Sequence, residues 1–244
     1  MTIVLRKIMI LVWSCFRLFE SQGAVTPVYY INDSVYSFAI QTSGDSTPSK
    51  KVADNDRIWL VTSANVALWA GSYIALNQAW YRDYPRSSFR FFDDMDEWNQ
   101  MDKAGHIWST YQVSRVSAEA WKWAGLNNRK SAWLGGISSL AYQSIIEIQD
   151  GFSTEWGFSW SDMGADVLGA GIFIAQEYVW NEQRIQIKFS SWRHDYPDDL
   201  LHRRDQLFGT EAMARLLKDY NAQTYWLSGN IRSFMPDLDI PKCL

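Results

Sequence analysis

The stretch Asn99-Gln-Met-Asp-Lys-Ala-Gly-His-Ile-Trp108 crowds three ionisable side chains, Asp102, Lys103 and His106, onto the start of a predicted helix. Their spacing of three and four residues puts all three on nearly one face of that helix. No phosphate loop, nucleophile elbow or zinc signature accompanies them. This stretch is therefore where we expect the unusual chemistry of the chain.

Hydrophobic patterning around this stretch predicts a small helical bundle. Residues 58–81 and 131–146 carry no charged side chain. From residue 184 onward, apolar and polar residues alternate as in half-exposed strands. We therefore predict an all-α fold, a compact bundle of about four helices with a small C-terminal β appendage. The predicted helices span residues 58–81, 98–123 (capped by Asp96), 129–149 and 161–182 (capped by Ser161), and the predicted strands span 184–189 and 224–231, with a charged loop at 193–205 and a short helix at 212–219 between them.

The first 23 residues have the features of an export signal. Arg6 and Lys7 form its basic part, Ile8-Met-Ile-Leu-Val-Trp13 its apolar part, and Ser21-Gln-Gly23 a cleavage site of small residues. We therefore expect a mature protein in the cell envelope, in the periplasm or at the outer membrane. The predicted divisions are a signal peptide (1–23), a flexible N-terminal segment (24–56), a helical bundle domain (57–183) and a strand-containing appendage (184–244).

The two cysteines bear on lipidation rather than on disulfide bonding. Cys15 follows Val12-Trp-Ser14, a partial match to a lipoprotein cleavage box, because a bulky Trp stands where a small or branched residue is preferred. Cys15 is thus either a lipidation site or an ordinary cysteine of a discarded signal. After cleavage Cys243 is the only cysteine, so no internal disulfide is expected.

The amino-acid composition argues against one class of binding partner and favours another. A net charge of -4 and a pI near 5.4 argue against a nucleic-acid partner, which would require a basic surface. The 14 Trp suit a membrane lipid interface, although Trp as core filler explains them equally well. The segment Ile58 to Tyr81 just reaches the ~20 residues of a membrane-spanning helix, but its polar residues also fit interfacial contact or a buried helix. We expect a membrane lipid interface, with an envelope protein as a possible further partner.

Two more acidic pairs belong with the opening stretch. Glu147 and Asp150 end the third predicted helix, whereas Asp162 and Asp166 begin the fourth. Antiparallel packing of consecutive helices brings these ends together, and it brings the start of the second helix to the same place. Gln143 lies on the same stripe of the third helix as Glu147.

Five carboxylates gathered with only Lys103 and His106 cannot all stay ionised without compensation. A bound divalent cation would offset the excess, with Asp102, His106, Glu147, Asp150, Asp162 and Asp166 as candidate ligands. A raised carboxyl pKa would instead equip one acid for proton transfer with His106. The third alternative is structural: the groups cap helix ends and form a polar network with Lys103 and Gln143 that fixes the packing of the helices.

Three motifs follow one another in the chain: Asp102-Lys-Ala-Gly-His106, Glu147-Ile-Gln-Asp-Gly151, and Ser161-Asp-Met-Gly-Ala-Asp-Val-Leu-Gly-Ala170. Together they resemble the YfiM-like family of predicted periplasmic lipoproteins, a domain of unknown function, over about residues 57–235. The lead-in Tyr81-Arg-Asp-Tyr-Pro-Arg-Ser-Ser-Phe-Arg-Phe-Phe92 resembles the Bacteroidota branch in particular. A more distant resemblance is to VanZ-like membrane proteins, which share an Asp-Lys and His start and a later acidic motif.

The resemblance implies a helical bundle at a membrane and a link to the cell envelope or to lipid-linked glycopeptide resistance, without an established reaction. It also implies further residues beyond Leu244, and hence a truncated appendage. We expect a non-catalytic, membrane-associated periplasmic or outer-membrane-facing protein with a buried Asp/His/Glu cluster. The alternative is a metal-assisted or acid/base hydrolase acting on a lipid-linked or cell-wall substrate, with His106, Glu147 and Asp102 as catalytic candidates.

Overall fold

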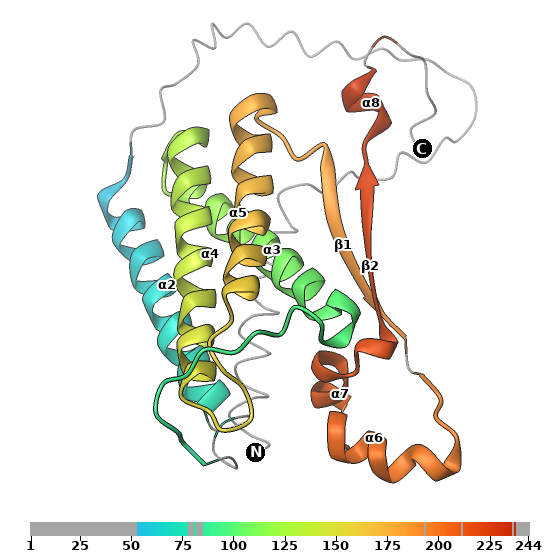
Figure 1. Ribbon diagram of the computed structural model, residues 1–244. Coiled ribbons are helices and arrows are strands. Elements are labelled where there is room, and N and C mark those ends of the chain that lie inside the picture. Colours follow the sequence, from blue (N-terminus) through green and yellow to red (C-terminus); the bar gives the residue numbers. More distant parts are fainter. Residues whose placement is uncertain are drawn as a thin grey trace, which may run out of the picture. The chain divides into compact units, whose positions relative to one another are not determined.

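The computed structural model of the chain describes residues 53–77, 81, 85–192, 194–210, 212–235 and 237. The predicted signal peptide, Cys15, residues 24–52 and Cys243 lie outside the described residues. The fold is mostly helical with a two-stranded antiparallel sheet near the C-terminus, which confirms the predicted class (Figure 1). The elements are α2 (Asn55–Leu76), η2 (Trp98–Gln100), α3 (Met101–Trp123), α4 (Asn128–Gly151), α5 (Trp160–Trp180), β1 (Ile185–Ser191), η3 (Asp198–Leu200), α6 (Leu201–Phe208), α7 (Ala212–Lys218), η4 (Tyr220–Ala222), β2 (Gln223–Gly229) and α8 (Ile231–Phe234).

Helices α3, α4 and α5 form the centre of the bundle, each packed against the other two (Figure 1). Tyr111 and Phe173 fill the core between them, and their rings meet edge to face with centroids 6.2 Å apart. Glycines let the backbones approach: a Cβ on Gly135 would lie 2.5 Å from the carbonyl oxygen of Ser114, and one on Gly169 would lie 2.4 Å from that of Ile107. Small residues thus set the helix spacing as they do in close-packed membrane bundles.

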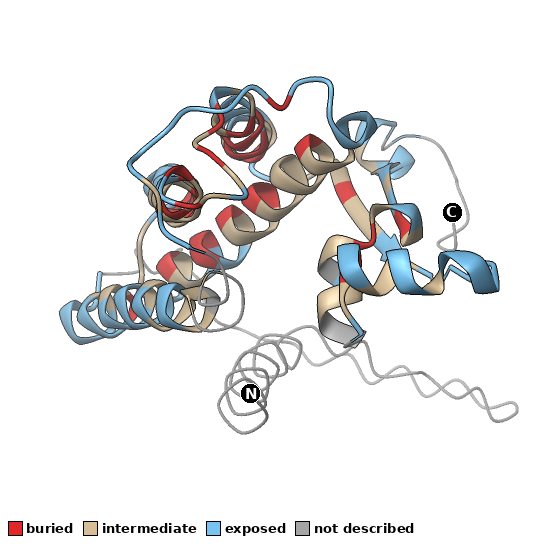
Figure 2. Ribbon diagram, turned by 60° about the horizontal axis from the view of Figure 1, so that its bottom comes forward, coloured by how far each residue is buried: buried red, intermediate tan, exposed pale blue. Residues whose placement is uncertain are grey.

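Helix α2 packs on this centre through a narrow face and leaves most of its surface exposed (Figure 2). Asp54 caps its start by accepting hydrogen bonds from the backbone of Asp56 and Arg57. Val61 is its buried contact with the small core around Trp121. Among the described residues α2 is the one helix long and apolar enough to cross a membrane, and only 6% of its most apolar window is buried.

The lead-in before α3 is fixed to the loop after α4. The backbone amides of Arg90 and Phe92 donate to the carbonyl oxygens of Gly151 and Phe158, each at 2.9 Å. The Arg90 side chain donates further hydrogen bonds to three carbonyl oxygens of this loop, including that of Thr154 at 2.6 Å. This pairing carries the acidic lead-in across the end of the bundle.

The predicted start of α3 was wrong in two respects. The α-helix begins at Met101, because Trp98, Asn99 and Gln100 adopt left-handed φ values of 50° to 64°. Asp96 is not its cap, since Gln100 holds the cap position without a side-chain hydrogen bond. Ser159 rather than Ser161 caps α5. Hydrophobic patterning predicts where a helix lies, but not the residue at which it begins, because that residue depends on the local backbone geometry.

The C-terminal appendage joins the bundle through α3. Strands β1 and β2 pair antiparallel, and Gln112 donates to the carbonyl oxygen of Ile187 at 2.9 Å. The predicted charged loop 193–205 was partly wrong, because residues from Leu201 onward form α6. Phe208 anchors this helix, because its ring is buried against the rings of Trp98 and Tyr196. One buried residue in a segment rich in charged residues gives no apolar pattern from which a helix could be predicted.

We expect Gly169→Ala to destabilise the protein by about 1–3 kcal/mol, because the new methyl group would collide with the α3 backbone. Gly171→Ala is the matched control on the same helix. A Cβ there meets nothing within 4 Å, so the better helix propensity of Ala should stabilise slightly. Denaturant unfolding of the full-length variants measures both changes, and equal stability of the two would contradict the close approach.

Candidate functional site: a charged cluster at one end of the bundle

The end of the bundle at which α3 and α5 begin and α4 ends gathers the predicted site residues. We call these residues, with one addition that the structure makes, the charged cluster. Its members are Asp94, Asp102, Lys103, His106, Glu147, Asp150, Asp162 and Asp166. Six carboxyl groups therefore surround one ammonium group and one imidazole.

Lys103 is buried, with 8% of the residue exposed, and bridges the lead-in to α5. Its Nζ lies 2.7 Å from Asp94 Oδ2 and 2.9 Å from Asp162 Oδ1. Burial opposes the charged form, but hydrogen bonds to these two acids outweigh it and raise the pKa of Lys103. Burial would likewise raise the pKa of Asp94, yet hydrogen bonds from Asp162, Lys103 and two serines hold that pKa well below its usual range. The Lys103–Asp94 pair is thus a fixed charge pair.

His106 is held by Asp166, the most deeply buried acid of the charged cluster, which has no exposed surface. Asp166 Oδ1 contacts His106 Nδ1 at 3.1 Å and accepts from Thr110 Oγ1 at 2.7 Å and Gln143 Nε2 at 3.1 Å. Burial opposes protonation of the imidazole, but the bond to Asp166 and the nearby acids raise the pKa of His106 to about 10. Nδ1 therefore carries a proton, and the ring is oriented by its carboxylate.

The other nitrogen of His106 faces the remaining acids. His106 Nε2 lies 3.7 Å from Glu147 Oε1. Burial raises the pKa of Glu147 to about 8, that of Asp150 to about 7 and that of Asp162 to about 7, each partly offset by the charge of His106. Near neutral pH these three carboxyl groups are partly protonated, which lowers the excess negative charge of the charged cluster.

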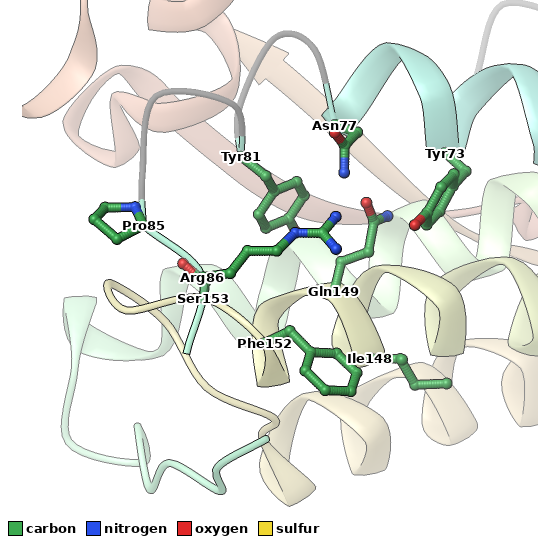
Figure 3. Close-up of a pocket in the computed structure, with 9 residues that line it drawn as sticks. All are labelled: Tyr73, Asn77, Tyr81, Pro85, Arg86, Ile148, Gln149, Phe152 and Ser153. Atoms are coloured by element: carbon green, nitrogen blue, oxygen red, sulfur yellow. The ribbon is translucent and has the colours of Figure 1, made fainter. Parts of the chain in front are cut away.

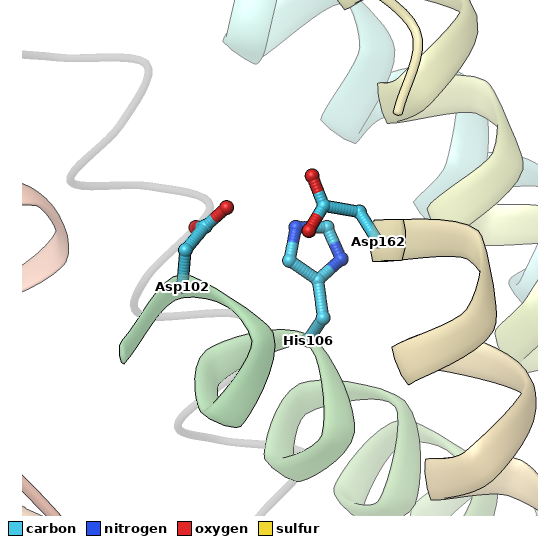
Figure 4. A group of neighbouring side chains, drawn as sticks. All are labelled: Asp102, His106 and Asp162. Atoms are coloured by element: carbon cyan, nitrogen blue, oxygen red, sulfur yellow. The ribbon is translucent and has the colours of Figure 1, made fainter. Parts of the chain in front are cut away.

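Two tyrosines complete the charged cluster from outside the three central helices. Tyr220, from the appendage, donates to Asp102 Oδ1 at 2.6 Å, and Tyr81 donates to Asp150 Oδ1 at 2.6 Å. Asp102, His106 and Asp162 each offer a ligand atom within 4.8 Å of the others (Figure 4). Of these, Asp102 and His106 keep part of their side chains exposed. This edge is therefore where an ion or a proton could enter.

The structure brings all six candidate ligands and both predicted network residues, Lys103 and Gln143, into this one region. Sequence patterning missed Asp94, Tyr81 and Tyr220 as partners. Asp94 lies in an irregular lead-in, where neither a period of 3.6 nor one of 2 indicates the direction of a side chain. The only sequence signal for Asp94 was its place in the acidic run Asp93-Asp-Met-Asp-Glu97 directly before the helix.

Residues 90–176 match the model of a family described as a predicted periplasmic lipoprotein (DUF2279). The matched region contains every member of the charged cluster. The similarity supports a cell-envelope or periplasmic protein of unknown function that is lipoprotein-like. Comparison with the curated proteins and with the solved structures found no match.

We expect the free energy of unfolding to fall as the pH rises from about 5 to 8, because over this range the folded carboxyl groups hold protons that the unfolded chain has already released. Each such proton contributes a slope of up to about 1.4 kcal/mol per pH unit. Glu147→Gln should make the slope shallower by up to one proton. Denaturant unfolding at several pH values, with a chelator present, measures it.

The matched control for this change is Glu155→Gln, which alters an exposed glutamate in the loop after α4. This control should keep the slope of the unmodified protein. A flat pH profile for the unmodified chain, or the same loss of slope in both variants, would contradict the raised carboxyl pKa values.

Proposed function

We propose that this chain is a membrane-associated helical protein of the cell envelope, with α2 in contact with lipid. The carrying observation is the outward face of α2, where Trp59, Leu60 and Leu68 are among the side chains more than half exposed. Contiguous apolar surface of this kind marks a membrane or protein contact rather than a solvated helix. Export by an N-terminal signal and membership of the YfiM-like family belong to this proposal and agree with the predicted-lipoprotein match. The signal is either removed as residues 1–23, which discards Cys15, or cleaved before a lipidated Cys15.

In this proposal the charged cluster is a non-catalytic network that fixes the packing of the helices. Pairs between its members join α3 to the lead-in, to α4 and to α5, and Gln143 of α4 and Tyr220 of the appendage add further contacts. Buried polar pairs of this kind contribute specificity of packing more than stability. Two cavities among the described residues, one around Tyr81 and one around Glu177, are lined by no member of the charged cluster, which favours a packing role over turnover of a bound substrate.

Leu68→Glu should lower binding of the full-length protein to lipid vesicles by tenfold or more, because burying one Leu side chain is worth about 2 kcal/mol. The added carboxylate further opposes contact with lipid. Leu227→Glu is the matched control, since Leu227 is also exposed but lies on β2. Vesicle flotation measures binding. Unchanged binding of Leu68→Glu would overturn the membrane contact of α2.

A second candidate function is divalent-cation binding, with acid/base or metal-assisted hydrolysis as its further consequence. The favouring observation is the His106–Asp166 contact, because a carboxylate on Nδ1 leaves Nε2 as the ligand atom of an oriented imidazole. Asp102 and Asp162 would supply oxygen ligands beside it. The ammonium of Lys103, 2.9 Å from Asp162, weakens this arrangement for a cation, which is why we rank it second.

If the charged cluster binds a cation, the full-length protein should bind Zn²⁺ or Mn²⁺ at one per chain, and Asp102→Asn and His106→Ala should each lower the affinity at least tenfold. Asp198→Asn, an exposed acid on η3, is the control and should bind normally. Titration calorimetry gives the affinity, and elemental analysis gives the stoichiometry. Absence of binding, with lower thermal stability in His106→Ala, would leave the packing network as the sole function of the charged cluster.

A further inference from the structure

A second polar site lies apart from the charged cluster, between the C-terminal ends of α2 and α4. It is a cavity of about 200 Å³ lined by residues from the end of α2, from the lead-in and from the end of α4 (Figure 3). Its walls are the rings of Tyr73, Tyr81 and Phe152, and the side chains of Arg86 and Gln149 point into it.

Gln149 is the anomaly in this cavity. The residue is 8% exposed, yet neither Nε2 nor Oε1 of its amide has a hydrogen-bond partner among the described residues. A buried amide without partners is unfavourable, because it has lost its hydrogen bonds to water without replacing them. The amide would be satisfied by a ligand that both accepts and donates a hydrogen bond.

Arg86 supplies the charge of the cavity. Arg86 lines the same cavity as the amides of Gln149 and Asn77 (Figure 3). No carboxylate of the described residues lies within 4.0 Å of its guanidinium group. Asp150, next to Gln149 in the chain, accepts a hydrogen bond from the Tyr81 hydroxyl at 2.6 Å. Among the described residues, the cavity therefore presents a guanidinium group without a carboxylate partner together with amide donors, a combination suited to a phosphate group.

The surroundings of the opening indicate where such a phosphate comes from. Ile148 and Phe152, on the rim of the cavity, are nearly half exposed, and Ile74 on α2 is more than half exposed. These apolar side chains continue from the outward face of α2 to the cavity. A soluble phosphate ester would leave them bare, whereas a lipid would cover them with an acyl chain.

We infer that this cavity binds the phosphate-ester headgroup of an anionic membrane lipid. The guanidinium of Arg86 and the amide of Gln149 donate to the phosphate, and Gln149 Oε1 accepts from a hydroxyl group of the headgroup. The acyl chain lies along Ile148 and Phe152. This inference rests on the proposed membrane contact of α2 and adds to it the class of lipid that is recognised.

The test compares vesicles of phosphatidylcholine alone with vesicles that also contain phosphatidylglycerol. The full-length protein should bind the anionic vesicles more tightly, and Arg86→Gln should lower that preference by about tenfold, as expected for loss of a charge-assisted pair. Arg203→Gln is the control, because it removes an equal charge from an exposed position on α6 and should keep the preference.

The variant Gln149→Leu distinguishes a lipid-binding role of Gln149 from a purely structural one. Replacing the unpaired amide by an apolar group of similar size should raise the thermal stability of the lipid-free protein while lowering its preference for anionic vesicles. A lower thermal stability together with an unchanged preference would overturn the role of Gln149.

Three outcomes separate the inference from the proposal on which it rests. Equal preference of Arg86→Gln and the unmodified protein for anionic vesicles would overturn the headgroup site and leave the membrane contact standing. Binding to neither kind of vesicle would overturn the membrane contact itself. Displacement of the protein from anionic vesicles by soluble glycerol phosphate would overturn the lipid as the source of the phosphate.

Discussion

A single carboxylate oxygen ties the three central helices together. Oδ1 of Asp166, on α5, contacts His106 and Thr110 on α3 and Gln143 on α4. Removing a carboxyl group from water is costly, and these three contacts from two other helices offset part of that cost. Any sliding or rotation of one helix against another would break at least one of these contacts. The relative positions of α3, α4 and α5 therefore depend on this atom.

The charge balance around that oxygen sets the chemical character of the protein. Lys103 and His106 are both cations at neutral pH, but six carboxyl groups surround them. Protons on the carboxyl groups with raised pKa values neutralise part of the excess negative charge. A cation that entered beside Asp102 would neutralise it in their place. Protons and cations therefore compete for the same negative charge. A change in envelope acidity would act directly on this end of the bundle.

Much of the fold followed from the sequence, because helix periodicity and antiparallel order are local and topological properties. The paired acids of α4 and α5 had to meet once consecutive helices packed antiparallel. The failures share a physical cause. Asp94, the left-handed turn at Asn99 and the contact of Tyr220 with Asp102 depend on the path of irregular chain, which no period describes. Likewise α6 was concealed because its stability comes from one buried ring, that of Phe208, rather than from an apolar stripe.

The attachment of the lead-in has a mechanical consequence. Arg90 fastens the chain to the loop after α4 through several carbonyl oxygens, between α2 and the charged cluster. Helix α2 itself touches the bundle through a narrow face around Val61. A displacement of the C-terminal end of α2 that is passed along the chain is therefore borne at Arg90 before it reaches the charged cluster. Small movements of this exposed helix can in this way leave the geometry of the charged cluster unchanged.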